Sequence, residues 1–222
     1  MALVLWALAL PHGTFILLIL ALGMVWFVNL YNFMDGIDGY AAVQCLLYCA
    51  GALWLADANG GWALGLLWVL SGATLGFLAF NLPPAKIFMG DVGSGFLGLA
   101  IAVAAVQLAA NSALPLVASL ILLSGFWFDA TVTLCVRLLT GQKFMQARRS
   151  HLYQRWCDRY GHGRTTVLLG GFGLVWLLPL AAMSVWVPQW QYAMLALAIV
   201  PLAWGCWRAR VGWPSPDNSV TK

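Results

Sequence analysis

Long apolar stretches constrain this chain more than any other feature. Seven stretches are apolar enough and long enough for a lipid-spanning helix, which needs roughly 20 mostly apolar residues. They cover about residues 14–31, 40–57, 62–80, 94–110, 115–136, 166–187 and 190–207. Only 8% of the residues are charged, against about a quarter in a soluble domain. The sequence therefore predicts an all-α, polytopic membrane helix bundle. We expect one transmembrane domain over 1–210 and a disordered polar tail over 211–222.

The basic residues fall on one side of this predicted topology. If the stretches alternate across the bilayer, all eleven Lys and Arg residues lie in the connections around 32–39, 81–93 and 137–165 or after the last span. By the positive-inside rule this side is cytoplasmic. Basic loops beside a membrane attract anionic lipid headgroups, so we expect a membrane lipid as partner and no nucleic acid.

Polar residues gather where the first apolar stretch ends. In NLYNFMDGIDG they recur at every third position: Asn29, Asn32, Asp35 and Asp38. On a straight helix these four side chains would not share one stripe. Gly36 and Gly39 tolerate unusual backbone geometry, so we predict a helix break there that turns both carboxylates toward one centre. The alternative is a polar helix end solvated by water.

A second cluster, NLPPAKIFMGDVGSGFLG, occupies residues 81–98. Pro83 and Pro84 are expected to end the preceding span, and Asp91 lies among glycines just before the next one. Mg²⁺ typically takes one or two carboxylates together with phosphate oxygens and water, so Asp91 suits a metal ligand, and Lys86 would neutralise phosphate nearby. The alternative is an ordinary turn between helices.

A third cluster lies in the long cytoplasmic connection, in ARRSHLYQRW at residues 147–156. Its cationic and hydrogen-bonding side chains suit a clamp for a diphosphate: Arg148, Arg149, His151, Gln154 and Arg155. The alternative is a set of ordinary surface residues. His162 is interpreted as a loop residue ahead of a helix. Asp129, within an apolar stretch, has either a functional role or a partner inside the bundle, and both readings stay open.

Taken together, the three clusters resemble the polyprenyl-phosphate N-acetylhexosamine-1-phosphate transferases, glycosyltransferase family 4. NLYNFMDGIDG resembles the family's Asn-x-x-Asn-x-x-Asp-Gly-x-Asp-Gly motif, FMGDVGSGFLG its Gly-Asp-x-Gly-Ser motif, and RRSHLYQR takes the place of its histidine-containing loop. Many members have several histidines in that loop, whereas this chain has His151 followed by Leu-Tyr-Gln. This version is similar to the branch that initiates O-antigen and related lipopolysaccharide or surface polysaccharide synthesis.

The resemblance implies a reaction and assigns roles to residues. A UDP-linked amino sugar and undecaprenyl phosphate would give a lipid diphosphate sugar and UMP at the bacterial inner membrane, with Mg²⁺, or Mn²⁺ in its place. Asp91 would bind the metal, and Asp35, Asp38 and His151 would be catalytic. Substrate-binding residues would be Asn29, Asn32, Lys86, Arg148, Arg149, Gln154 and Arg155. Direct attack and a covalent aspartyl intermediate stay open, as does a homodimer.

One family feature is missing from the sequence. The family carries an Asp-Asp pair on an earlier cytoplasmic loop, and this chain contains no such pair. We therefore expect a C-terminal portion of the family fold without its N-terminal helices, whose activity on its own stays open. Two other readings are a small transporter, which would place polar groups nearer the midplane, and a catalytically inactive membrane scaffold.

Overall fold

The computed structural model describes residues 12–142 and 150–213. Throughout these ranges the regular structure is helical, with no strand. The helices are, in chain order, α2 (His12–Met34), α3 (Tyr40–Leu55), α4 (Trp62–Asn81), α5 (Gly90–Ala110), α6 (Leu116–Leu122), α7 (Ser124–Leu139), α8 (Leu152–Tyr160), α9 (His162–Phe172), α10 (Leu178–Trp186) and α11 (Gln191–Arg208). A π-helical turn, η2 (Gly173–Leu177), joins α9 to α10 just before Pro179, which has no N–H to continue an α-helical ladder.

The predicted polytopic bundle is confirmed. Five helical segments of the described chain are long and apolar enough to cross a membrane: Thr14–Met34, Trp62–Asn81, Gly90–Ala110, His162–Trp186 and Pro188–Arg208. The bent pair formed by α6 and α7 makes a sixth if it is taken as one span. The remaining predicted stretch, 40–57, forms α3, which has only 16 residues and is buried on most sides. It therefore lies inside the bundle as a short apolar helix.

The predicted span 115–136 is not one straight helix. It breaks at Leu123, where α6 and α7 meet at a bend of 75°. Ser124 and Gly125 follow the break, and Gly/Ser pairs are a common cause of sharp kinks. The Leu122 carbonyl accepts a 2.9 Å hydrogen bond from the Gln44 side chain of α3. A backbone group freed at the kink is therefore satisfied by a neighbouring helix, as burial away from water requires.

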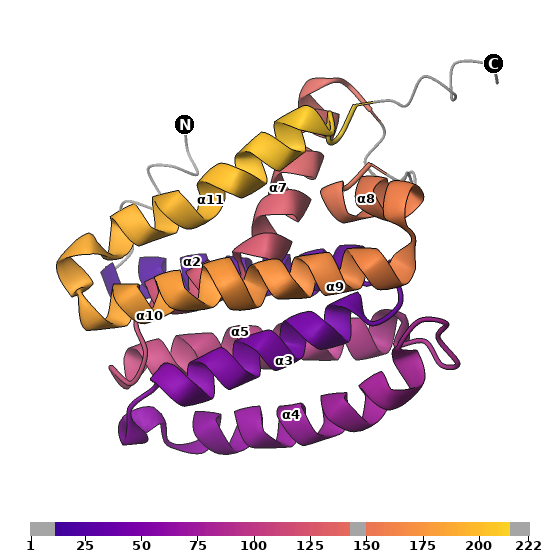
Figure 1. The fold of residues 1–222 in the computed structure, drawn as a ribbon. Helices are drawn as coiled ribbons and strands as arrows, with labels where there is room; N and C mark the ends of the chain where they lie inside the picture. Colours follow the sequence, from indigo (N-terminus) through magenta and orange to yellow (C-terminus); the bar gives the residue numbers. More distant parts are fainter. Residues whose placement is uncertain (1–11, 143–149, 214–222) are drawn as a thin grey trace.

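The close pair α2 and α5 determines where the polar clusters meet. Gly98 of α5 lies against the α2 backbone, because a Cβ there would come within 3.1 Å of the Phe27 carbonyl oxygen and the Val28 Cα. Gly98 thus allows the two helices to approach closely. In Figure 1 the α2–α3 turn, the α4–α5 connection, α8 and the start of α9 all lie at the same end of the bundle. Segments far apart in sequence are therefore neighbours there.

The connection predicted as a long loop between 137 and 165 contains a helix of its own. Its α8 is amphipathic, with Leu152, Tyr153 and Cys157 buried. The packed part of the chain also continues past residue 210, because Val211 is buried and the Gly212 N–H donates to the Ser150 carbonyl at 3.0 Å. The rest of the predicted tail, 214–222, lies outside the described residues.

Candidate functional site

A small polar cavity lies at the end of the bundle where the first two sequence clusters meet. Its volume is about 260 Å³, below the range of about 300–1,000 Å³ typical of sites that bury a whole small ligand. Four of the predicted site residues line it: Asn32, Asp35, Asp38 and Asp91. The remaining lining residues are Gly36, Ile37, Asn81, Phe88, Met89, Gly90 and His162. Residues separated by more than fifty positions thus share one concave surface.

The two helix ends explain why Asp35 and Asp91 are neighbours. Helix α2 ends at Met34, so Asp35 is the first residue beyond it, and Gly39, with a φ of 76°, directly precedes α3. The predicted helix break between Gly36 and Gly39 is therefore confirmed. Asp91 lies in the first turn of α5, where the helix dipole favours a negative charge. Because α2 reaches the cavity with its C-terminal end and α5 with its N-terminal end, both carboxylates face one space.

The electrostatics of this space favour a cation. Burial is the larger cause and the neighbouring Asp91 carboxylate the smaller one, and together they raise the pKa of Asp35 to about 7. Within the described ranges, neither carboxylate has a hydrogen-bond donor or a basic partner. Those ranges contain no group of three or more His, Cys, Asp or Glu side chains close enough to hold a metal by themselves. Two carboxylates without partners do fit Mg²⁺, which usually completes its shell with phosphate oxygens and water.

Asp38 has a different environment, since it links three segments. Its Oδ2 accepts a hydrogen bond from the Ala85 N–H at 3.1 Å, and its Oδ1 lies 3.1 Å from Nδ1 of His162. The Asp38 backbone carbonyl accepts a 2.8 Å bond from the Thr166 hydroxyl. These contacts fix the α2–α3 turn against the α4–α5 connection and the start of α9.

His162 and Asn81 complete the cavity wall, and sequence reasoning did not assign them a role. Nδ1 of His162 either accepts from the Asp38 N–H, at 3.3 Å, or, when protonated, donates to the Asp38 carboxylate. The Asn81 side chain accepts from the Gly39 N–H at 2.9 Å and donates to the Ile87 carbonyl at 2.8 Å. Asn81 is the last residue of the apolar helix α4. An amide side chain at the end of an apolar span was the sequence signal that could have indicated its role. His162 offered no comparable local pattern.

The other predicted site residues do not line this cavity. Asn29 is exposed and donates to the Val25 carbonyl one helical turn earlier. Lys86 is exposed, and its contact is a backbone N–H bond to the Phe80 carbonyl. Arg155 donates to the carbonyls of Trp213 and Arg210, at 2.8 and 3.4 Å. Arg148 and Arg149 lie outside the described residues. The roles predicted for these five residues stay predictions.

His151 is buried, with 5% of its surface exposed, and does not reach the cavity either. Its Nδ1 lies 3.6 Å from the Asp129 carboxylate, and its backbone N–H donates to the Gln154 side chain at 3.2 Å. Gln154 therefore contributes to the start of α8. Of the two readings for Asp129, the structure gives it a partner inside the bundle: the carboxylate accepts from the backbone N–H groups of Leu152 and Tyr153, at 2.9 and 3.3 Å.

Comparison with known proteins shows which family the chain resembles. A model of glycosyl transferase family 4 matches residues 2–109, which contain both polar clusters of the cavity. The chain is 44% identical over 97 residues to the phospho-N-acetylmuramoyl-pentapeptide-transferase of Chlamydia trachomatis serovar L2, covering 42% of this chain and 29% of that protein. It is 35% identical over 140 residues to a probable undecaprenyl-phosphate N-acetylglucosaminyl 1-phosphate transferase of Bacillus subtilis, covering 60% and 39%.

Residues 2–109 of the chain are similar to glycosyl transferase family 4. The resemblance to polyprenyl-phosphate hexosamine-1-phosphate transferases is thereby confirmed. The match to each of these two relatives spans well under half of the relative's length. The family match ends at residue 109 and includes Asp35, Asp38 and Asp91 but not the segment around His151.

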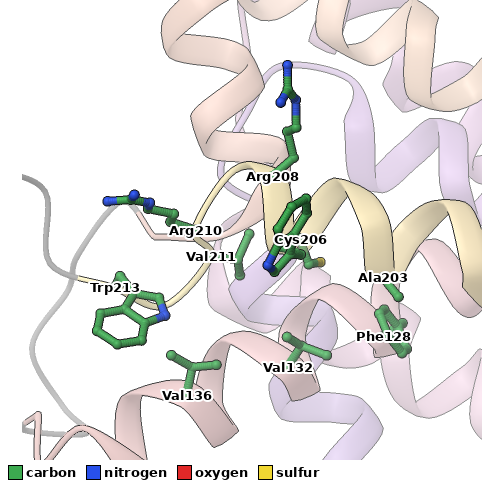
Figure 2. Close-up of a pocket in the computed structure, with 10 residues that line it drawn as sticks. Phe128, Val132, Val136, Ala203, Cys206, Arg208, Arg210, Val211 and Trp213 are labelled. Carbon is green, nitrogen blue, oxygen red and sulfur yellow. The ribbon is translucent and has the colours of Figure 1, made fainter.

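The chain also has a larger groove away from the acidic cavity. It has a volume of about 870 Å³ and lies between α7 and α11. Figure 2 shows Phe128, Val132 and Val136 along α7, facing Ala203 and Cys206 of α11. Arg208 and Arg210 rise at its rim. None of the predicted site residues lines this groove, so the smaller acidic cavity remains the candidate site.

Proposed function

We propose that the protein acts in the transfer of an N-acetylamino-sugar 1-phosphate from a UDP-sugar to undecaprenyl phosphate. A phosphate oxygen of the lipid forms the new bond to the phosphorus that carries the sugar, and the bond from that phosphorus to UMP breaks. The observation that supports this proposal is the cavity that brings Asp35 and Asp91 together beside Asn32 and Asp38. The names of the two relatives support the same class of reaction.

The residues of the cavity divide into two groups in this proposal. Asp35 and Asp91, whose carboxylates lack other partners among the described residues, would hold Mg²⁺ against the diphosphate. When bound, the metal neutralises the phosphate oxygens during transfer. Asp38, Asn81 and His162 keep the α2–α3 turn in place, and Asn32 offers an amide to a polar substrate group. Phosphoryl transfer depends mainly on such positioning and charge stabilisation.

The same arrangement supports a lipid acceptor and a cytoplasmic location in this proposal. The cavity lies at an end of the bundle with basic residues such as Lys86 and Arg164 nearby in sequence, which suits an anionic headgroup at a cytoplasmic membrane surface. We further propose that the product initiates O-antigen or a related surface polysaccharide, on the basis of the segment SHLYQ.

The test is UMP release from membranes that contain the chain. Membranes are supplied with UDP-N-acetylglucosamine, undecaprenyl phosphate and Mg²⁺, and UMP is measured by chromatography. Asp91→Asn should reduce UMP release to near background, because it removes a metal-binding charge while keeping the side-chain shape. Asp57→Asn is the matched control, since Asp57 is an exposed aspartate in the α3–α4 connection. It should retain full activity.

Two results would contradict the proposal. Full activity of the Asp91→Asn protein would remove Asp91 from the site. An unmodified chain that releases no UMP with any UDP-amino sugar, in membranes where a full-length relative is active, would favour the inactive scaffold.

A further inference from the structure

Tyr153 of α8 contacts the turn between α2 and α3 that carries Asp35 and Asp38, although it does not line the cavity. Its hydroxyl donates a 2.8 Å hydrogen bond to the Phe33 carbonyl, near the C-terminal end of α2. The last carbonyls of a helix have no partner within the helix, so Tyr153 satisfies one of them from 120 residues away. The bond therefore fixes the backbone two residues before Asp35.

The Tyr153 side chain also packs closely against Gly36. A Cβ at this position would overlap the Tyr153 hydroxyl oxygen and would lie 3.1 Å from its Cζ. Gly36 itself is exposed and lines the cavity. The side chain of Tyr153 also packs against the turn at this residue. A larger residue at position 36 would have to displace the Tyr153 side chain, so this contact favours glycine there.

Tyr153 is itself held firmly. It is 1% exposed, and its ring lies 5.5 Å from that of Tyr40 and 5.8 Å from that of His151, centroid to centroid. Its backbone N–H, together with that of Leu152, donates to the Asp129 carboxylate of α7. The Asp129 carboxylate also accepts a hydrogen bond from the Thr133 hydroxyl at 3.1 Å. A continuous set of contacts therefore runs from the kinked helix α7 through the start of α8 to the end of α2.

We propose that Tyr153 is a positioning residue, which orients the Asp35–Asp38 turn by hydrogen bonding to Phe33 and packing against Gly36. The proposal rests on the function proposed above for the cavity. It gives α8 a role that does not require its side chains to touch the substrate. His151 then acts through the same cluster, beside Asp129 and the Tyr153 ring.

The first test measures the turn without any assay of activity. Hydrogen exchange of the purified chain is followed by mass spectrometry for peptides covering residues 33–40. Tyr153→Phe removes only the hydroxyl, and exchange at 33–40 should become about fivefold faster, the effect expected for one net hydrogen bond. Tyr48→Phe is the matched control: Tyr48 is fully buried within α3, and its hydroxyl bonds to the Ser119 side chain at 3.3 Å and not to the turn. It should leave exchange at 33–40 unchanged.

A double substitution separates positioning from general loss of stability. Gly36→Ala alone should disturb the turn strongly, because the new methyl group meets the Tyr153 hydroxyl. In the Tyr153→Phe background the same change should cost less, because the overlapping oxygen is gone. Equal effects of Gly36→Ala in both backgrounds would show that the two positions are not coupled.

The second test uses the proposed reaction. Tyr153→Phe should raise the Mg²⁺ concentration that gives half-maximal UMP release, and added Mg²⁺ should restore part of the lost rate, whereas Tyr48→Phe should do neither. Unchanged exchange at 33–40 in the Tyr153→Phe protein would overturn the inference while leaving the proposed function intact. If the unmodified chain released no UMP, the proposed function would fail, and the exchange experiment would still decide the role of Tyr153.

Discussion

Asp35 gives the cavity a dependence on pH. Its pKa is raised to about 7 by burial and then by Asp91, whereas an aspartate in an unfolded chain titrates near 3.9. A carboxyl whose pKa is higher in the folded state stabilises the fold while it is protonated. This contribution is complete below about pH 4 and is lost as the pH rises through 7.

We therefore expect the free energy of unfolding, measured without divalent cations, to fall as the pH rises from about 4 to about 7. Asp35→Asn should flatten this dependence, because the amide does not ionise. Denaturant or thermal unfolding in EDTA at several pH values measures the effect, with Asp57→Asn as the control that should follow the unmodified chain. Parallel pH profiles for Asp35→Asn and the unmodified chain would show that Asp35 does not titrate in this range.

Single residues also show how far sequence reasoning reached. The helix break and the convergence of Asn32, Asp35, Asp38 and Asp91 followed from spacing, glycine positions and helix ends. His162 was interpreted as a loop residue, since its contact with Asp38 joins positions 124 residues apart and leaves no local pattern. The buried position of His151 depends on Asp129 in another helix, which local sequence does not reveal.

At the level of helices, the start of α8 depends on a carboxylate from α7. Asp129 is 2% exposed and accepts from the N–H groups of Leu152 and Tyr153. Buried N–H groups without partners cost about 1–3 kcal/mol each, and losing a helix cap costs a similar amount. Asp129 thus holds an amphipathic segment that the apolar pattern alone assigned to a loop.

Asp129→Ala should destabilise the chain by roughly 2–4 kcal/mol, because both N–H groups lose their acceptor. Asp129→Asn should cost less, since the amide oxygen still accepts from one of them. Thermal unfolding followed by circular dichroism gives the order of stabilities, and Asp57→Ala, at an exposed aspartate, should be close to the unmodified chain. Equal stability of Asp129→Ala and Asp57→Ala would show that the carboxylate does not support α8.

The kink between α6 and α7 illustrates the limit of hydropathy at this scale. The mean hydropathy over residues 115–136 indicates one apolar span. It does not show that Ser124 and Gly125 allow a break. The Gln44 side chain that bonds to the Leu122 carbonyl comes from α3, so the stabilising partner was also outside the window. Composition predicted the existence of the apolar segment, and tertiary contacts decided its shape.

For the molecule as a whole, the helix order and the basic residues predict one orientation in the membrane. The α3–α4 connection, with η1 (Ala58–Gly60), and the α4–α5 connection lie at opposite ends of α4. The 20 residues of α4 span about 30 Å, close to the thickness of the hydrocarbon core of a membrane. The α4–α5 connection contains Lys86 and borders the acidic cavity, while the other has no basic residue. The cavity should therefore face the cytoplasm.

Thiol labelling in intact bacteria checks this orientation with two introduced cysteines. Cys135 is exposed whereas the other four cysteines are buried, so Cys135 is first replaced by serine. Asn59→Cys, in the exposed α3–α4 connection, should react with a membrane-impermeant maleimide in cells with a permeable outer membrane. Leu82→Cys, at a side chain that is 51% exposed and directly follows Asn81 of the cavity wall, should react only after the inner membrane is opened. The reverse pattern would place Asp35 and Asp91 on the periplasmic side, where cytoplasmic UDP-sugars do not reach them, and would contradict the proposed reaction together with the topology.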